Sequence, residues 1–249
     1  MNTTDETTLE WHAEEQRFLQ KNGVIGSQAE LEALSPLKSR WIHNTRREVY
    51  ITPSGYVLKR FCQFPGRKDF RRVWRREHRA LARLEGLSVP RSLGYMQADH
   101  SAGRSSVLYV RSCLAGDPLE HIALPDIPRV ADLFATFHNR GVVTLDPQPE
   151  NFLHPASQPD TLAFIDFGRA RVYNAVNPLL YISIGKEMLR LTREGRLSDE
   201  QLEQVLARYA ESKKMNGLAG MLIHLGLAFW RWRYRSKDRK RAKRKDARS

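Results

Sequence analysis

An aspartate, an asparagine and a second aspartate occur in an order and spacing that suit phosphoryl transfer. Asp146 and Asn151 bound the segment Asp-Pro-Gln-Pro-Glu-Asn, and Asp166 opens the triplet Asp-Phe-Gly. Transfer of phosphate from ATP to a hydroxyl needs a carboxylate that takes the hydroxyl proton and hard oxygen ligands for Mg2+. We therefore expect Asp146 to be the catalytic base, and Asn151 and Asp166 to bind Mg2+. Gly168 would let the backbone bend where Asp166 approaches the phosphate.

The sequence between Asn151 and Asp166 predicts a β-hairpin. Two short apolar runs, 151–153 and 161–165, flank the turn-forming stretch Ala-Ser-Gln-Pro-Asp at 156–160. Because Asn151 and Asp166 lie at the two ends of this hairpin, it would bring them to one edge.

A helix is predicted immediately before the segment that begins at Asp146. Apolar residues recur at helical spacing from Val130 to Phe137, and Gly141 stands where such a helix would end. His138 falls on the same stripe. We interpret it as a packed core histidine rather than a catalytic base.

A nucleotide site of this kind also needs a lysine on a strand and a helical glutamate that positions it. An alternating apolar segment predicts a strand that carries Lys59, and the run from Phe70 to Leu84 places Glu77 on the apolar stripe of a helix. An inward carboxylate costs several kcal/mol unless it is paired, so we expect a Lys59–Glu77 ion pair. Glu85 is the alternative partner, and Arg60 would take the place of Lys59 if the strand register were shifted.

Together these elements resemble the Kdo/heptose lipopolysaccharide-core kinase family, small bacterial members of the protein-kinase-like superfamily. The resemblance runs from about residue 41 to 191 and is carried by the segments 56–61, 76–81, 137–143, 146–153 and 165–170. It implies ATP-dependent phosphorylation of a sugar hydroxyl (heptose or Kdo) on the lipopolysaccharide inner core or a related glycolipid. The cofactors implied are ATP and Mg2+, bound by Lys59, Glu77, Asn151, Asp166 and Gly168.

The fold implied is a two-lobed α+β fold with a small antiparallel-sheet N-lobe and a mainly helical C-lobe. The length of 249 residues fits one such domain and is too short for a second globular domain beside it. We expect an N-terminal leader at 1–40, the kinase-like domain at 41–230 and a basic tail at 231–249. The N-lobe would span about 41–111, and the C-lobe about 112–230.

Further elements are predicted from local patterns. A strand at 106–111 leads into a hinge at 112–116, whose backbone would bind adenine. Helices are expected at 179–191 and 199–211, and Ser198 with Gln201 forms a capping box for the second.

Three features depart from the pattern of protein kinases. Thr144 and Leu145 replace the histidine-containing pair before the catalytic aspartate, and Gln148 stands where protein kinases often have a lysine. The segment 43–49 supplies arginines in place of a glycine-rich loop, either to neutralise phosphate or as an ordinary exposed turn. These departures keep open a catalytically weak, nucleotide-binding pseudokinase.

Two related activities agree less well with the sequence. A small-molecule phosphotransferase of the aminoglycoside or choline kinase type would share every catalytic residue, but its acceptor pocket usually collects acidic groups, and the C-lobe is not notably acidic. Protein kinase activity is disfavoured because no Ala-Pro-Glu triplet follows Gly168.

The positive charge is concentrated at the C-terminus. The segment 231–249 holds eleven Lys or Arg against two Asp, which is +9 of the total formal charge of +13. Arg231-Trp232-Arg233-Tyr234-Arg235 interleaves cations with aromatic rings, a combination suited to an anionic membrane surface. We therefore rank the anionic inner-membrane surface first as partner of the tail, ahead of an inert tail and of nucleic acid.

The sequence predicts a cytoplasmic chain that is peripheral on the inner face of the inner membrane. Cys62 and Cys113 are too few for a disulfide framework, and no signal peptide precedes the domain. The apolar run 218–230 is too short to span a bilayer, and we interpret it as a core helix of the C-lobe rather than an interfacial one.

Overall fold

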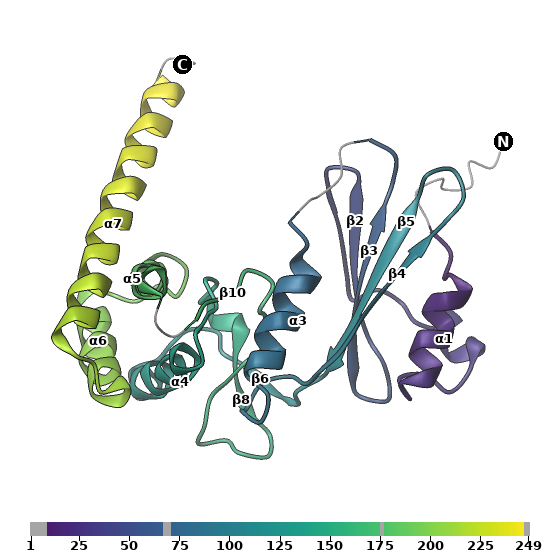
Figure 1. Cartoon of the computed structure of the whole chain (residues 1–249), viewed down its shortest axis with the longest axis horizontal. Helices are drawn as coiled ribbons and strands as arrows, with labels where there is room; N and C mark the ends of the chain where they lie inside the picture. Colours follow the sequence, from purple (N-terminus) through teal and green to yellow (C-terminus); the bar gives the residue numbers. More distant parts are fainter. Residues whose placement is uncertain (1–8, 67–70, 175–176, 247–249) are drawn as a thin grey trace. The chain divides into compact units, whose positions relative to one another are not determined.

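The computed structural model describes residues 9–66, 71–174 and 177–246, without the side chains of 241 and 243–246. The chain forms two compact units (Figure 1). The first comprises Met1–His78 and Pro90–Leu114, and the second comprises Arg79–Val89 and Ala115–Ser249.

The first unit is built on one antiparallel sheet of five strands in the order β1-β2-β3-β5-β4. The strands are β1 (Lys38–Ile42), β2 (Thr45–Ile51), β3 (Tyr56–Gln63), β4 (Ser92–Asp99) and β5 (Ser105–Ser112). The predicted strands around Lys59 and at 106–111 are confirmed as β3 and β5.

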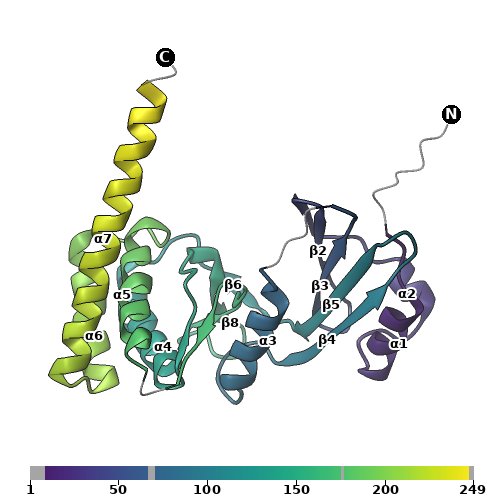
Figure 2. The ribbon, with the colours of Figure 1, turned by 45° about the horizontal axis from the view of Figure 1, so that its top comes forward.

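The two faces of this sheet bury different side chains, because neighbouring residues of a strand point in opposite directions. On one face Leu58 packs with Leu19 of α1 (Ala13–Lys21) and Leu31 of α2 (Gln28–Glu32), and Figure 2 shows these two helices beside the sheet. On the other face Phe61 packs with Trp74 of α3 (Val73–Arg83). Lys59 shares the α3 face and Arg60 the α1 face. Phe70, which was expected to begin the apolar stripe of α3, lies outside the described residues.

The predicted leader differs from the structure. From Leu9 onward it is folded into the first unit, and Leu19 and Leu31 are almost fully buried. Its most buried polar residue is Glu15, whose carboxylate pairs with Arg60 at 2.7 Å. Arg60 also donates to the carbonyl oxygen of Leu9. This pair and the apolar contacts give the segment a fixed place on the sheet.

The arginines of the segment 43–49, interpreted either as a phosphate-neutralising group or as part of an ordinary exposed turn, lie in strand β2. The turn between β1 and β2 is formed by His43 and Asn44. Arg46 pairs with Glu48 at 2.8 Å. The guanidinium of Arg47 lies over the Phe61 ring and is 8% exposed, so the interpretation as an ordinary exposed turn is wrong for this residue.

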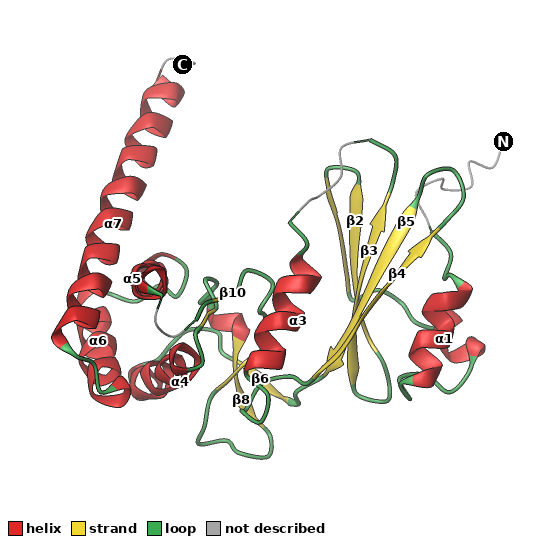
Figure 3. Ribbon diagram, viewed as in Figure 1, coloured by secondary structure: helices red, strands yellow, loops and turns green. Residues whose placement is uncertain are grey.

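The second unit is mainly helical, as the red ribbons of Figure 3 show. Its helices are α4 (Ile127–Asn139), α5 (Pro178–Arg193), α6 (Asp199–Lys213), α7 (Gly217–Asp246) and the short turns η1 (Leu124–Asp126) and η2 (Pro149–Asn151). Two small sheets have the orders β6-β8-β9 and β10-β7. Their strands are β6 (Gly116–Pro118), β7 (Val142–Val143), β8 (Phe152–Pro155), β9 (Ala163–Phe164) and β10 (Arg171–Val172).

Local sequence signals in this unit are confirmed. β8 and β9 form the predicted hairpin, and the capping box of Ser198 and Gln201 begins α6. Helix α4 ends just before Gly141, which has φ +72° and a backbone so close to Tyr173 that a Cβ atom would collide with its carbonyl oxygen. The α+β division expected from the sequence is therefore present.

Helices α5 and α7 cross in close contact. A Cβ atom on Gly226 of α7 would lie 2.7 Å from the carbonyl oxygen of Ile182, and one on Gly185 of α5 would meet the carbonyl oxygen of Ile223. Ile223 and Leu227 are buried in the core of the unit. Two glycines thus let the backbones of α5 and α7 approach each other directly.

Helix α7 continues through the predicted boundary at residue 230. The apolar run and the basic segment form one helix as far as Asp246, because Tyr234 stacks under Arg193 of α5 at 4.5 Å and Asp238 pairs with the same arginine. Within the described residues, no helix combines the length and the apolar character that crossing a membrane requires.

Candidate active site

The hairpin of the second unit brings the predicted site residues together. Asn151 donates through Nδ2 to the backbone oxygen of Asp146 at 2.8 Å, which closes the loop between them. The Ile165 amide donates to the Asn151 carbonyl at 2.9 Å, so Asp166 follows directly after this contact. Three residues distant in sequence therefore meet at one end of β8 and β9.

Asp146 is held among cationic side chains. Its Oδ1 accepts from Arg169 at 3.0 Å and from Gln148 at 3.2 Å, and Arg190 lies 3.5 Å away. Burial raises the pKa of Asp146, Arg169 opposes that shift, and the negative charge of Asp166 adds to it.

The Asp-Phe-Gly triplet is anchored by its central residue. Phe167 is fully buried and packs edge-on against Phe137 of α4 and Phe164 of β9. The Gly168 amide donates to Asp166 Oδ1 at 3.0 Å, which orients that carboxylate. Packing of a large ring thus fixes the position of Asp166.

A buried carboxylate that the sequence did not indicate supports the loop 144–151, called here the catalytic loop because it carries the predicted base Asp146. Glu187 of α5 accepts from the Thr144 hydroxyl and, at 2.6 Å, from the Leu145 amide. Its other oxygen lies 2.6 Å from His138 Nε2, and His138 Nδ1 bonds the Tyr209 hydroxyl of α6. Leu145 has φ +59°, a conformation that needs such support in a residue with a side chain.

This network explains two features of the sequence. His138 is completely buried and burial lowers its pKa, as expected of a packed core histidine. Thr144, which departs from the usual histidine, holds the loop through Glu187. The signal that could have found Glu187 is its place on the buried face of the predicted helix, the same signal that revealed Glu77.

The predicted ion pair in the first unit is present. Lys59 Nζ donates to both carboxylate oxygens of Glu77, at 2.7 and 2.9 Å, and Glu77 is fully buried. The sequence did not indicate that Arg111 of β5 also lies 3.1 Å from Glu77. Because Arg60 faces Glu15, the strand register that assigns Lys59 to Glu77 is correct.

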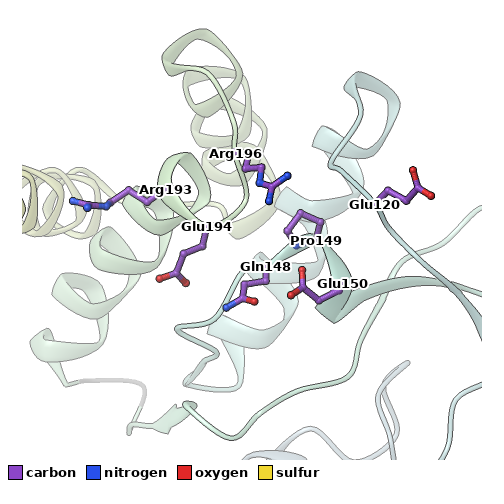
Figure 4. A pocket seen from close by; sticks show the side chains of 7 residues that line it. All are labelled: Glu120, Gln148, Pro149, Glu150, Arg193, Glu194 and Arg196. Carbon is purple, nitrogen blue, oxygen red and sulfur yellow. The ribbon is translucent and has the colours of Figure 1, made fainter. Parts of the chain in front are cut away.

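A pocket of about 260 Å³ opens beside the catalytic loop in the second unit (Figure 4). Gln148, Pro149 and Glu150 form one side, and six of its seven lining residues are polar or charged. The remaining lining residues are Glu120, Arg193, Glu194 and Arg196. Arg190 links the pocket to Asp146, because its guanidinium contacts both Glu194 and Asp146.

The donor set suits a magnesium ion that is shared with phosphate. Among the described residues, no group of three or more His, Cys, Asp or Glu side chains could hold a metal by itself. Mg2+ at phosphotransfer sites is bound by one or two carboxylates together with substrate phosphates and water. Asn151 and Asp166 supply hard oxygen ligands of this kind.

Comparison with known proteins establishes the fold. No family model and no curated protein matches the chain. A solved structure of WaaP in complex with acyl carrier protein matches with a TM-score of 0.53 and 21% sequence identity, over 83% of this chain and 90% of that chain. The chain therefore has the kinase-like α+β fold that its motifs predict.

Proposed function

We propose that this protein is an ATP-dependent kinase that phosphorylates a sugar hydroxyl, heptose or Kdo, of the lipopolysaccharide inner core or a related glycolipid. The observation that carries the proposal is the position of Asp146, Asn151 and Asp166 at one end of the β8–β9 hairpin. There Asn151 donates to the Asp146 carbonyl, and the amide of Ile165, the residue before Asp166, donates to the Asn151 carbonyl. The fold shared with WaaP and the resemblance of the sequence motifs to lipopolysaccharide-core kinases support it.

Each residue has a role that follows from its chemistry. Asp146 takes the proton of the acceptor hydroxyl, and its raised pKa makes it a stronger base than an ordinary aspartate. Lys59, oriented by Glu77, binds the α- and β-phosphates of ATP. Asn151 and Asp166 would hold Mg2+, which would supply positive charge beside the transferred phosphate.

The pocket beside Gln148 suits a hydroxylated acceptor. Carboxylates accept from sugar hydroxyls and guanidinium groups donate to them, and both kinds of side chain line the pocket. Choline would be bound by an aromatic cage, and the pocket has no aromatic residue in its lining. This contrast favours a sugar over choline as the acceptor.

The proposed function includes binding of the chain to the membrane that holds its substrate. A core glycolipid is presented at the inner face of the inner membrane, where the nine net positive charges of 231–249 favour binding to anionic lipid. WaaP has been solved in complex with acyl carrier protein, and binding of such a carrier by this chain can be measured directly.

The test is phosphate transfer from labelled ATP to core lipopolysaccharide isolated from cells that lack the gene. Asp166→Ala should abolish transfer. Asp146→Asn should retain nucleotide binding while turnover falls by orders of magnitude. Mass spectrometry of the product should show one added phosphate on a heptose or Kdo residue. Nucleotide binding without transfer to any acceptor would identify a pseudokinase, and transfer to aminoglycosides or choline alone would identify the small-molecule class.

A further inference from the structure

Helix α7 has two apolar faces, and only one of them packs against the second unit. Ala219, Ile223 and Leu227 point into the core. On the opposite side five large apolar side chains, called here the outer stripe, are between 43% and 65% exposed. They are Leu218, Met221, Leu225, Phe229 and Trp232. Their steps of three and four residues place them on one line along the helix.

The outer stripe is an unusual concentration of exposed apolar surface. It holds half of the large apolar side chains that are exposed among the described residues. The apolar run 218–230 predicts a core helix of the C-lobe rather than an interfacial one. The structure shows that the core takes one side of this helix and leaves the other uncovered.

The line of the outer stripe continues into positive charge. The next positions at the same spacing are Ser236 and Arg239, and the exposed Arg235 and Lys240 flank them. The opposite side of α7 still contacts α5 in this part of the helix, because Asp238 pairs with Arg193. One exposed face of a single anchored helix is thus apolar in its first half and basic in its second.

We propose that this face of α7 is a docking surface for an anionic lipid bilayer. The outer stripe would enter the boundary between headgroups and acyl chains, with the helix lying along the membrane plane, and the basic half would bind anionic headgroups. Phe229 and Trp232 stand at the junction of the two halves, and Trp is favoured at the depth of the headgroups. The proposal deepens the membrane partner of the proposed function, but the geometry of α7 carries it without reference to catalysis.

The charge distribution argues against the two other occupants. In a parallel pair of α7 helices the basic halves would face each other and repel. In an antiparallel pair that overlaps along the whole helix, each basic half would face the apolar half of the partner, so the stripes would not cover each other. Nucleic acid would use the cations but would leave the outer stripe exposed to water.

The experiment measures binding of the full chain to vesicles, without ATP or acceptor, so its outcome is independent of phosphotransfer. The vesicles are phosphatidylcholine alone or phosphatidylcholine mixed with phosphatidylglycerol. Leu225→Ser with Phe229→Ser should lower the partition coefficient on the mixed vesicles about tenfold or more, because two large side chains no longer enter the interface. Leu124→Ser with Leu179→Ser is the matched control, since these leucines are 62% and 57% exposed elsewhere in the second unit. The control should bind as the unchanged chain does.

Two further measurements test the orientation of the helix. Lipids brominated on their acyl chains should quench tryptophan fluorescence, and Trp232→Phe should remove most of that quenching while the chain still floats with vesicles. A second variant, Leu218→Ser with Met221→Ser, should also weaken binding, and circular dichroism should show that both stripe variants are folded.

Equal binding of the stripe variants and the control would overturn the proposal. So would a dimer in sedimentation that the stripe variants dissociate, which would assign the face to a second copy. Stripe-independent binding of RNA in preference to mixed vesicles would overturn it as well.

Discussion

The hydrogen bonds from Thr144 and Leu145 to Glu187 can be tested with one nearly isosteric substitution. Thr144→Val removes the hydroxyl and keeps the volume, so that Glu187 loses one of its buried donors. A hydrogen bond to a charged group contributes about 1.5–3 kcal/mol, and we expect the free energy of unfolding to fall by that amount. Domains of this kind are stable by about 5–15 kcal/mol, so the variant should remain folded.

The same substitution should slow turnover without weakening nucleotide binding. Thr144 lies two residues before Asp146, and Leu145 depends on Glu187 for its left-handed backbone. A displacement of about 1 Å in a catalytic group costs up to about 100-fold in rate, so we expect kcat to fall about 10- to 100-fold while KM for ATP changes little.

The assays are chemical denaturation and steady-state phosphate transfer, with Thr136→Val as the control. Thr136 bears an exposed hydroxyl on α4 that bonds only the Asp132 carbonyl, so its loss should change stability by less than about 0.5 kcal/mol. If Thr144→Val were as stable and as active as Thr136→Val, the proposed role of Glu187 in holding the loop would be refuted.

Three other outcomes are expected. Lys59→Met and Glu77→Gln should have non-additive effects on ATP use in a double-mutant cycle, because each change removes the ionic partner of the other residue. Simple additivity would refute their action as a pair. Arg169→Gln removes a charge that lowers the pKa of Asp146, so the acidic limb of the pH–rate profile should move to higher pH; a shift to lower pH would show that Arg169 has another role. Burial lowers the pKa of His138, so its neutral form contributes stability above its ordinary pKa of about 6.5 that is lost as pH falls. Thermal melts should therefore show a loss of stability on acidification that His138→Gln reduces, and an unchanged pH dependence would contradict the assignment.

Residues near each other in sequence were predictable because local spacing determines which way their side chains point. Glu77 was recognised because a carboxylate on an apolar helical stripe needs a buried partner, and Lys59 was the available cation. Asn151 and Asp166 were paired because a hairpin brings its ends together. In each case one element, or two adjacent ones, contained the information.

Pairs that join distant elements were not predictable in this way. Glu15 meets Arg60 across 45 positions, and Glu187 meets Leu145 across 42. Many cations of the sequence could have met Glu15, and only the folded sheet selects one of them. The second apolar face of α7 was also hidden, because an apolar stretch in a sequence does not reveal how many of its sides the core covers.

The crossing of α5 and α7 at Gly185 and Gly226 joins the backbones of the two helices close to the residue that supports the catalytic loop. Gly185 lies two residues before Glu187, which holds Leu145 next to Asp146. A surface that α7 rests on is therefore connected to the base through backbone contact and a buried carboxylate, without a flexible linker. The distance between Asp146 and that surface would then be fixed by the packing of the second unit. A hydroxyl attached to the surface by a spacer that is too short or too long would not lie beside Asp146. Hydroxyls that are chemically alike would therefore be distinguished by their distance from the surface.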